Sequence, residues 1–361
     1  MSLSGKAVTG VKWTSISTVI RAVIQLALLS IAAHFLDAEA LGLYALVQLV
    51  ISFCQLYMDM GIGNSVIHHQ QVSKRHLSEL YTINLCLGFV LAVIVYLISP
   101  VLANFFDTLL LIELTQLISI VFILSALFRI HLVELQKRLE FSTIAKVELL
   151  SSFSGFSLSV LLMINGIGVK ALIFGYLLTV FVQMLGFRFL AKTTLSLSKP
   201  QSWSALKKFL SFGAYQTTDG TVNYFNSQID LILVGKLLGA EVLGGYSLAR
   251  QFCFRPAMVI NPVLTRVAFP VMAKLQHDSG LGNVYCKLLT ILASINFPLY
   301  LCMAVFAKQI VLLLFGDNWL HIVPVFQFLS LWCLVRSINN PVGSLLMAVG
   351  KVKLALKWNT A

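Results

Sequence analysis

Apolar residues come in ten blocks along the chain, and short polar links separate the blocks. The blocks cover residues 12–35, 41–63, 79–103, 109–133, 142–164, 167–190, 209–236, 242–268, 286–307 and 323–349. A hydrocarbon core about 30 Å thick is crossed by a helix of about 20 apolar residues. The pattern therefore predicts an all-α integral membrane protein with ten transmembrane helices.

One motif of the form Leu-x-Ala-Glu-x-Leu-Gly-x-Tyr-x-Leu occurs twice. The first copy covers residues 36–46 and the second covers residues 238–248, an offset of 202 without a gap, with identity at seven of eleven positions. Each copy lies between two apolar blocks. An internal repeat of this kind is typical of membrane transporters built from two related halves.

The repeat divides the chain into two predicted bundles. We expect an N-terminal six-helix bundle at 1–195, a cytoplasmic linker at 196–208 and a C-terminal bundle at 209–361. The second bundle holds four helices, and Lys351–Ala361 reads as the beginning of an eleventh. By the repeat, position 361 falls inside the fifth segment of the first half, so we expect a product that lacks later helices.

The basic residues of the loops predict on which side of the membrane the N-terminus and the linker lie. By alternation, fourteen Lys and Arg residues fall on one side of the membrane, and three fall on the other, namely Lys170, Lys236 and Lys308. Lys and Arg are retained on the cytoplasmic face. The N-terminus and the 196–208 linker are therefore predicted to be cytoplasmic.

Composition supports a membrane protein. Basic loops beside the membrane explain the positive net charge, so binding to nucleic acid is not needed to explain it. The 361 residues are 58% hydrophobic and 11% charged, with a mean hydropathy of +0.89, whereas a soluble chain has roughly 25% charged residues. The net charge of +12 follows from the basic cytoplasmic loops, so no nucleic-acid partner is expected. The partner expected first is the lipid bilayer.

Polar residues form a stripe on the first helix of each predicted half. Residues 12–35 carry Thr14, Thr18, Arg21 and Gln25 at helical spacing, and the block 209–236 carries a second stripe, made of Tyr215, Asp219, Asn223, Asn226 and Asp230. A charge at the bilayer centre costs on the order of 3 kcal/mol, so it normally faces water or a partner. The stripes predict a central polar cavity. An interhelical hydrogen-bond seam is the alternative.

Arginines within the apolar blocks indicate an anionic ligand. Arg250 and Arg255 follow Arg21 as candidates for a cationic substrate path, because guanidinium groups bind phosphate with paired hydrogen bonds. Gln25, Tyr215, Asn223 and Asn226 are candidates for polar contacts in that path. Asp219 or Asp230 is a candidate for binding a coupling ion.

Several catalytic signatures are absent from the sequence. It contains no G-x-x-x-x-G-K-[ST], no H-E-x-x-H and no G-x-S-x-G. The six cysteines are scattered without metal or redox spacing. We therefore expect a protein that is not an enzyme and that needs no cofactor and no metal.

Scattered motifs resemble those of the polysaccharide exporters. They are Gly10-Val11-Lys12-Trp13, the repeated Leu-x-Ala-Glu-x-Leu-Gly-x-Tyr element, Asp59-x-Gly61, Arg255-Pro256, Phe269-Pro270 and Phe315-Gly316-Asp317-x-Trp319. The chain resembles the Wzx-type, colanic acid exporter-like branch of the multidrug/oligosaccharidyl-lipid/polysaccharide flippase superfamily. The resemblance implies two helical bundles in a V, a cationic cavity, and a place in the bacterial inner membrane.

The resemblance also implies a substrate and a mechanism. The expected substrate is a polyprenyl-diphosphate-linked oligosaccharide, a repeat unit of exopolysaccharide, O-antigen or colanic-acid type, carried across the inner membrane by alternating access. Polysaccharide polymerase and assembly proteins are expected partners. Two alternatives stay open: a drug or cation antiporter of the same superfamily, and a membrane scaffold that transports nothing.

Overall fold

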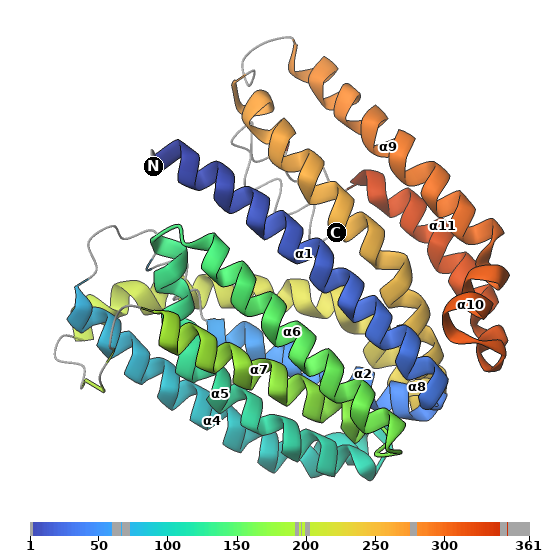
Figure 1. Ribbon diagram of the computed structural model, residues 1–361, viewed down its shortest axis with the longest axis horizontal. Helices are drawn as coiled ribbons and strands as arrows, with labels where there is room; N and C mark the ends of the chain where they lie inside the picture. Colours follow the sequence, from blue (N-terminus) through green and yellow to red (C-terminus); the bar gives the residue numbers. More distant parts are fainter. Residues whose placement is uncertain are drawn as a thin grey trace. The chain divides into compact units, whose positions relative to one another are not determined.

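The computed structural model of the chain describes residues 3–59, 73–191, 203–274 and 280–339, together with residues 66, 195, 197, 198 and 345. Every regular element in these ranges is helical (Figure 1). The predicted eleventh segment at 351–361 lies outside the described residues. The helices are α1 Leu3–Phe35, α2 Ala38–Asp59, α4 Lys74–Phe106, α5 Leu110–Lys137, α6 Phe141–Ile164, α7 Lys170–Leu190, α8 Trp203–Lys274, α9 Leu281–Val305, α10 Ala307–Phe315, the 3-10 helix η1 Asp317–Ile322, and α11 Val323–Asn339.

The helices confirm the predicted all-α membrane class. Nine stretches in the described ranges are long and apolar enough to cross a membrane. The seventh and eighth predicted blocks form one continuous element, α8, which is interrupted at Gly239, where φ is 84° and ψ is 174°. A positive φ is accessible to glycine without a steric penalty. The break at Gly239 therefore gives the two segments that the hydrophobic pattern predicts.

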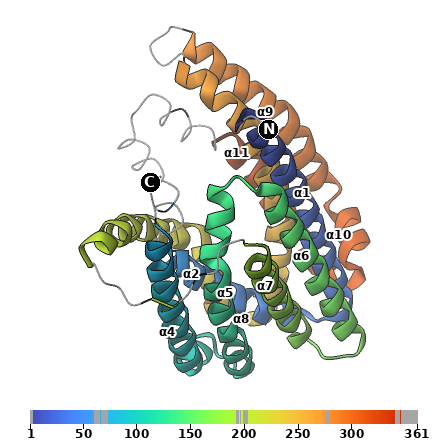
Figure 2. The same ribbon diagram turned by 60° about the vertical axis from the view of Figure 1, so that its left-hand side comes forward.

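The described residues form two compact units, residues 1–244 and 245–361. In the first unit α4 packs along α5, and α6 packs along both α7 and α1 (Figures 1 and 2). In the second unit α9 packs on α11. The division into bundles at 195 and 209 stays a prediction.

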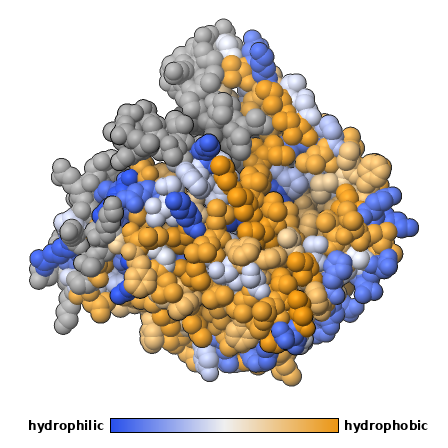
Figure 3. Space-filling view, in the orientation of Figure 1, coloured by the Kyte–Doolittle hydropathy of each residue, from blue (hydrophilic) through white to orange (hydrophobic). Residues whose placement is uncertain are grey.

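The outer face of the first unit is apolar. Large hydrophobic side chains are exposed along it, among them Leu97, Val101, Leu109, Leu150 and Phe189. Figure 3 shows hydrophobic residues covering most of the drawn surface over α4 to α7. Exposed apolar surface on this scale is stable when it faces lipid rather than water.

Within the first unit, the first copy of the repeat packs against residues 238–244 of the second copy. A Cβ atom added to Gly42 would collide with the carbonyl oxygen of Ala240, and one added to Gly244 would collide with the carbonyl oxygen of Ala38. Each glycine therefore meets the backbone of the opposite copy, four residues before the opposite glycine. The sequence repeat thus marks a nearly symmetric crossing of α2 with α8.

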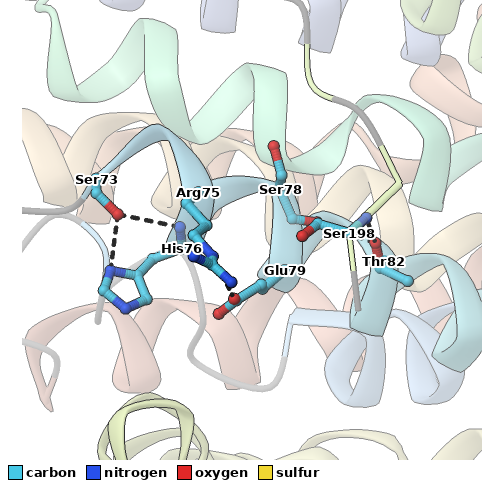
Figure 4. Close-up of polar contacts among 7 residues, drawn as sticks. All are labelled: Ser73, Arg75, His76, Ser78, Glu79, Thr82 and Ser198. Carbon is cyan, nitrogen blue, oxygen red and sulfur yellow. Dashed lines mark hydrogen bonds and ion pairs between the residues drawn. The ribbon is translucent and has the colours of Figure 1, made fainter. Parts of the chain in front are cut away.

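Polar contacts organise the beginning of α4 (Figure 4). The Ser73 hydroxyl accepts a hydrogen bond from the His76 backbone N–H at 3.2 Å, which satisfies one of the free donors of the first turn. Arg75 Nε lies 3.4 Å from the buried Glu79. The Ser198 backbone N–H donates to Thr82 Oγ1 at 3.0 Å. This contact places Ser198 and the beginning of α4 at the same end of the unit.

A buried tyrosine joins α9 to α8 in the second unit. The Tyr300 hydroxyl donates to the Cys253 carbonyl at 3.0 Å and accepts from the Ala257 N–H at 3.1 Å. These two backbone groups are a normal i, i+4 helical pair, so the hydroxyl is inserted into the hydrogen-bond ladder of α8. Pro256, next to Ala257, has no N–H to add to that ladder.

Replacing Tyr300 by Phe is expected to destabilise the protein by about 1–2 kcal/mol, because two backbone groups lose a shared buried partner. The thermal unfolding midpoint of the detergent-purified protein measures the effect. The matched control is Tyr285→Phe on the same helix, whose ring packs on the cluster of Met272, Leu288 and Leu292. Equal midpoints for the two variants would contradict the inserted-hydroxyl account.

Candidate functional site

The polar stripe of α1 divides into two parts with different roles. The hydroxyls of Thr14 and Thr18 donate to carbonyls of their own helix, those of Gly10 and Thr14. Arg21 instead leaves α1 and pairs with α6, because its Nη1 lies 3.3 Å from Glu148 Oε2. Both side chains keep partial solvent exposure, 36% for Arg21 and 22% for Glu148. Arg21 is therefore the residue of this stripe that contributes a charge to a site.

Arg21 and Glu148 line a cavity inside the first unit. Its volume is about 250 Å³. Helices α1, α2, α5, α6 and α7 all contribute to its wall. The polar lining residues are Arg21, Gln55, Ser125, Arg129, Glu148, Tyr176, Thr179 and Gln183, and the apolar ones are Met58, Phe128, Leu132, Val180 and Phe187.

The cavity has an excess of positive charge and of hydrogen-bond donors. Two guanidinium groups, Arg21 and Arg129, face one carboxylate, Glu148. Gln55 Nε2 donates to the Tyr176 hydroxyl at 2.8 Å, which fixes the orientation of both side chains. The Nε of Arg21 is buried and makes no hydrogen bond to the described residues. The lining therefore favours an anion that accepts hydrogen bonds.

The volume limits what the cavity holds. Pockets for drug-sized ligands are larger, about 300–1,000 Å³. A phosphate or diphosphate group is therefore of a size that the cavity can hold.

The remaining predicted residues of the first unit lie away from this cavity lining. Gln25, Asn223 and Asn226 are exposed, and Asp230 is half-buried. The side chains of two further predicted residues, Tyr215 and Asp219, lie outside the described ones. The roles of all six stay predictions.

The part of α8 that carries this second stripe packs on α2. The Tyr224 hydroxyl donates to the Leu49 carbonyl at 2.8 Å. The ring of Phe53 contacts the rings of Tyr224 and Phe225. These contacts fix which face of α8 remains open for Asn223 and Asn226.

The two predicted arginines of α8 belong to the second unit. The Arg250 guanidinium lies over the ring of Phe254, with Cζ 4.8 Å from the ring centroid. Arg255 is half-buried. Arg21 and these two arginines therefore belong to different units, and a shared substrate path stays a prediction.

Sequence reasoning missed most polar residues of the cavity lining. Among them are Glu148, Gln55, Tyr176 and Gln183, which come from three different helices. Glu148 carried a signal, because it is a lone acid within the apolar block 142–164 and an ionisable residue in a membrane helix usually marks a function. The amides and the tyrosine carried none, because their convergence depends on how α2 and α7 pack.

Comparison with known proteins decides the family. Residues 31–324 match the family model described as "Polysaccharide biosynthesis protein". The chain belongs to this family. It is 34% identical over 360 residues to the lipopolysaccharide biosynthesis protein WzxC of Escherichia coli (strain K12), covering 99% of this chain and 73% of WzxC. It is 31% identical over 360 residues to the teichuronic acid biosynthesis protein TuaB of Bacillus subtilis (strain 168), covering 99% of this chain and 74% of TuaB.

These relatives confirm the resemblance drawn from the sequence motifs, and solved structures confirm the fold. The lipid II flippase MurJ, in an inward closed conformation, matches 96% of this chain and 78% of its own with a TM-score of 0.78 at 13% identity. An inward-facing multidrug resistance MATE family transporter of the MOP superfamily matches 97% of this chain and 87% of its own chain, with a TM-score of 0.72 at 15% identity. The chain therefore has the fold of these multi-pass membrane transporters.

Proposed function

We propose that this protein carries a polyprenyl-diphosphate-linked oligosaccharide across the bacterial inner membrane by alternating access. The observation that carries the proposal is the cavity of the first unit, where Arg21 and Arg129 face one carboxylate and several neutral donors. Family membership supports it, because the relatives WzxC and TuaB are named for polysaccharide biosynthesis. The neighbour MurJ is named as a flippase of lipid II.

The cavity and the substrate match in charge. A diphosphate is a multivalent anion, and two arginines bind it with charge-assisted hydrogen bonds. The excess of guanidinium over carboxylate disfavours a cationic drug, so the antiporter alternative is the weaker one. The apolar tail stays in the bilayer, where its transfer costs nothing, and the charged head group is what needs a path.

Glu148 acts in this proposal as the resting counter-ion of Arg21. Without ligand, the pair at 3.3 Å keeps the guanidinium from being an uncompensated charge within the membrane. An arriving diphosphate competes with Glu148 for the same guanidinium. Release of the substrate on the far side restores the pair.

Orientation and partners belong to the same proposal. The excess of basic residues in alternate loops supports a cytoplasmic N-terminus and a cytoplasmic 196–208 linker in a bacterial cell. The chain acts as a transporter without a catalytic step of its own. A polymerase or another assembly protein receives the oligosaccharide after translocation.

Cells that lack this protein provide the first test. We expect polyprenyl-diphosphate-linked oligosaccharide to accumulate on the cytoplasmic leaflet while the surface polysaccharide disappears. Lipid-linked intermediates are extracted and quantified, and the surface polymer is measured in parallel. Unchanged levels of the lipid-linked intermediate would contradict the transport proposal.

Replacing Glu148 by Gln is expected to raise the affinity for polyprenyl diphosphate by up to about fivefold, because an exposed or partly exposed ion pair that competes with the ligand contributes up to about 1 kcal/mol. The dissociation constant of the purified variant measures the effect. Glu113→Gln is the matched control, since Glu113 pairs with Lys170 outside the cavity. A weaker affinity in Glu148→Gln would contradict the counter-ion role.

A further inference from the structure

One hydroxyl group in the cavity of the first unit has a proton that no described residue accepts. Tyr176 of α7 accepts a hydrogen bond from Gln55 Nε2 of α2 at 2.8 Å, and this bond uses only a lone pair of the hydroxyl oxygen. The described residues give the Tyr176 hydroxyl no second hydrogen bond. Because Tyr176 lines the cavity, its O–H group is available to a ligand there.

Gln55 determines the direction of that proton. Since an amide N–H group occupies one lone pair of the Tyr176 hydroxyl, the O–H bond points away from Gln55. A hydroxyl that accepts one hydrogen bond is also a stronger donor in the next, because neighbouring hydrogen bonds polarise one another. The two residues come from different helices, so this arrangement exists only once α2 and α7 have packed into the unit.

The neighbouring hydroxyl of α7 is used in a different way. Thr179 also lines the cavity, but its Oγ1 donates to the Gly175 carbonyl of its own helix at 3.0 Å. Helix α6 passes close to this hydroxyl, because a Cβ added to Gly155 would collide with Thr179 Oγ1. Thr179 therefore belongs to the packing of α6 on α7, whereas the proton of Tyr176 is left for a ligand.

A neutral donor suits an anion site within a membrane. A cation there is costly unless it has a partner, as Arg21 has Glu148. A hydroxyl donates to an anion without adding a charge that needs such a partner. Its hydrogen bond to a charged oxygen is roughly twice as strong as one to a neutral oxygen. In this cavity Tyr176 thus adds a strong contact to those of Arg21 and Arg129 without adding a charge to the resting site.

We propose that Tyr176 binds a phosphate oxygen of the substrate and that Gln55 is the positioning residue that directs its proton toward the ligand. Arg21 and Arg129 provide the charge of the site, and Tyr176 provides a donor of fixed direction. This inference rests on the proposed transport of a lipid-linked diphosphate. It adds a binding residue from α7 and a positioning residue from α2 to that site.

Binding of polyprenyl diphosphate to the purified full chain in lipid nanodiscs tests the role of Tyr176. Tyr176→Phe is expected to weaken binding about tenfold or more, because a hydrogen bond to a charged oxygen is lost. Tyr44→Phe is the matched control and is expected to bind like wild type. The Tyr44 hydroxyl also accepts from a glutamine, Gln48 Nε2 at 2.7 Å, but Tyr44 is not part of this cavity lining.

The outcomes separate this inference from the transport proposal. Wild-type affinity in Tyr176→Phe, with normal binding by the wild type, would overturn the role of Tyr176 and leave the transport proposal intact. Folded wild-type protein that binds no polyprenyl diphosphate would overturn both. Unfolding midpoints show that each variant is folded.

A double variant separates donation to the ligand from bracing of α2 on α7. Gln55→Met is expected to weaken binding by a smaller factor than Tyr176→Phe, since the hydroxyl remains but loses its fixed direction. Combined with Tyr176→Phe, it is expected to add nothing, because Gln55 acts through the lost hydroxyl. Recovery toward wild type in the double variant would show that the pair is only a brace. A further loss would show that Gln55 binds the ligand directly. Either result would overturn the proposal.

Discussion

Replacing Arg21 by Ala is expected to lower translocation of the lipid-linked oligosaccharide by about ten- to a hundredfold, since hydrogen bonds to charged groups contribute about 1.5–3 kcal/mol. The loss follows from the cavity, where Arg21 is one of two guanidinium groups in the lining. Surface polysaccharide in cells expressing the variant at normal protein level measures the effect. A scaffold that transports nothing would show little change.

Two controls separate the role of Arg21 in binding from its role in charge balance. Lys12→Ala removes an exposed cation from the same helix and is expected to transport normally. Arg21→Ala leaves Glu148 without its described ion-pair partner, which destabilises the fold by itself. The double variant Arg21→Ala with Glu148→Gln removes that stranded charge. We expect it to remain defective, and recovery of transport would show that Arg21 only neutralises Glu148.

Replacing Gly42 or Gly244 by Ala is expected to destabilise the protein by about 1–3 kcal/mol, the usual cost of overpacking. An added Cβ at either position meets a backbone carbonyl of the opposite repeat copy, and backbone gives way less readily than a side chain. The thermal unfolding midpoint measures the effect. Gly282→Ala in α9 is the control, because a Cβ there meets nothing within 4 Å.

The double variant at the crossing gives a sharper test. Once Gly42→Ala has separated α2 from α8, a second Cβ at Gly244 finds the space already opened. The two effects on the free energy of unfolding are therefore expected to be less than additive, because the residues share one contact. Strict additivity, or a midpoint equal to that of Gly282→Ala, would contradict a reciprocal crossing.

The hydrophobic pattern was sufficient to predict the helices, because each must cross the same hydrocarbon thickness. The blocks 142–164 and 167–190 differ from α6 and α7 by at most three residues at either end. The repeat predicted two related halves. It did not predict that the copies contact each other at Gly42 and Gly244, since this depends on the packing of distant segments.

The site was predictable only where a residue is costly to bury. Arg21 stood out because a cation in an apolar block requires a partner. Its partner Glu148 is 127 positions away, and only the packing of α1 on α6 brings the two together. Thr14 and Thr18 share the spacing of Arg21, yet they satisfy their hydroxyls within α1. Helical spacing therefore identifies a face and does not distinguish a functional polar residue from a self-satisfied one.

The most direct measurement of the central claim uses the purified protein in sealed vesicles. Lipid-linked oligosaccharide from cells lacking the protein is placed in one leaflet, and a glycosidase outside the vesicle reports how much reaches the accessible leaflet over time. The account predicts rapid transfer with the wild type and with Lys12→Ala, and slow transfer with Arg21→Ala. Transfer no faster than in protein-free vesicles, in the presence of folded wild-type protein, would contradict it.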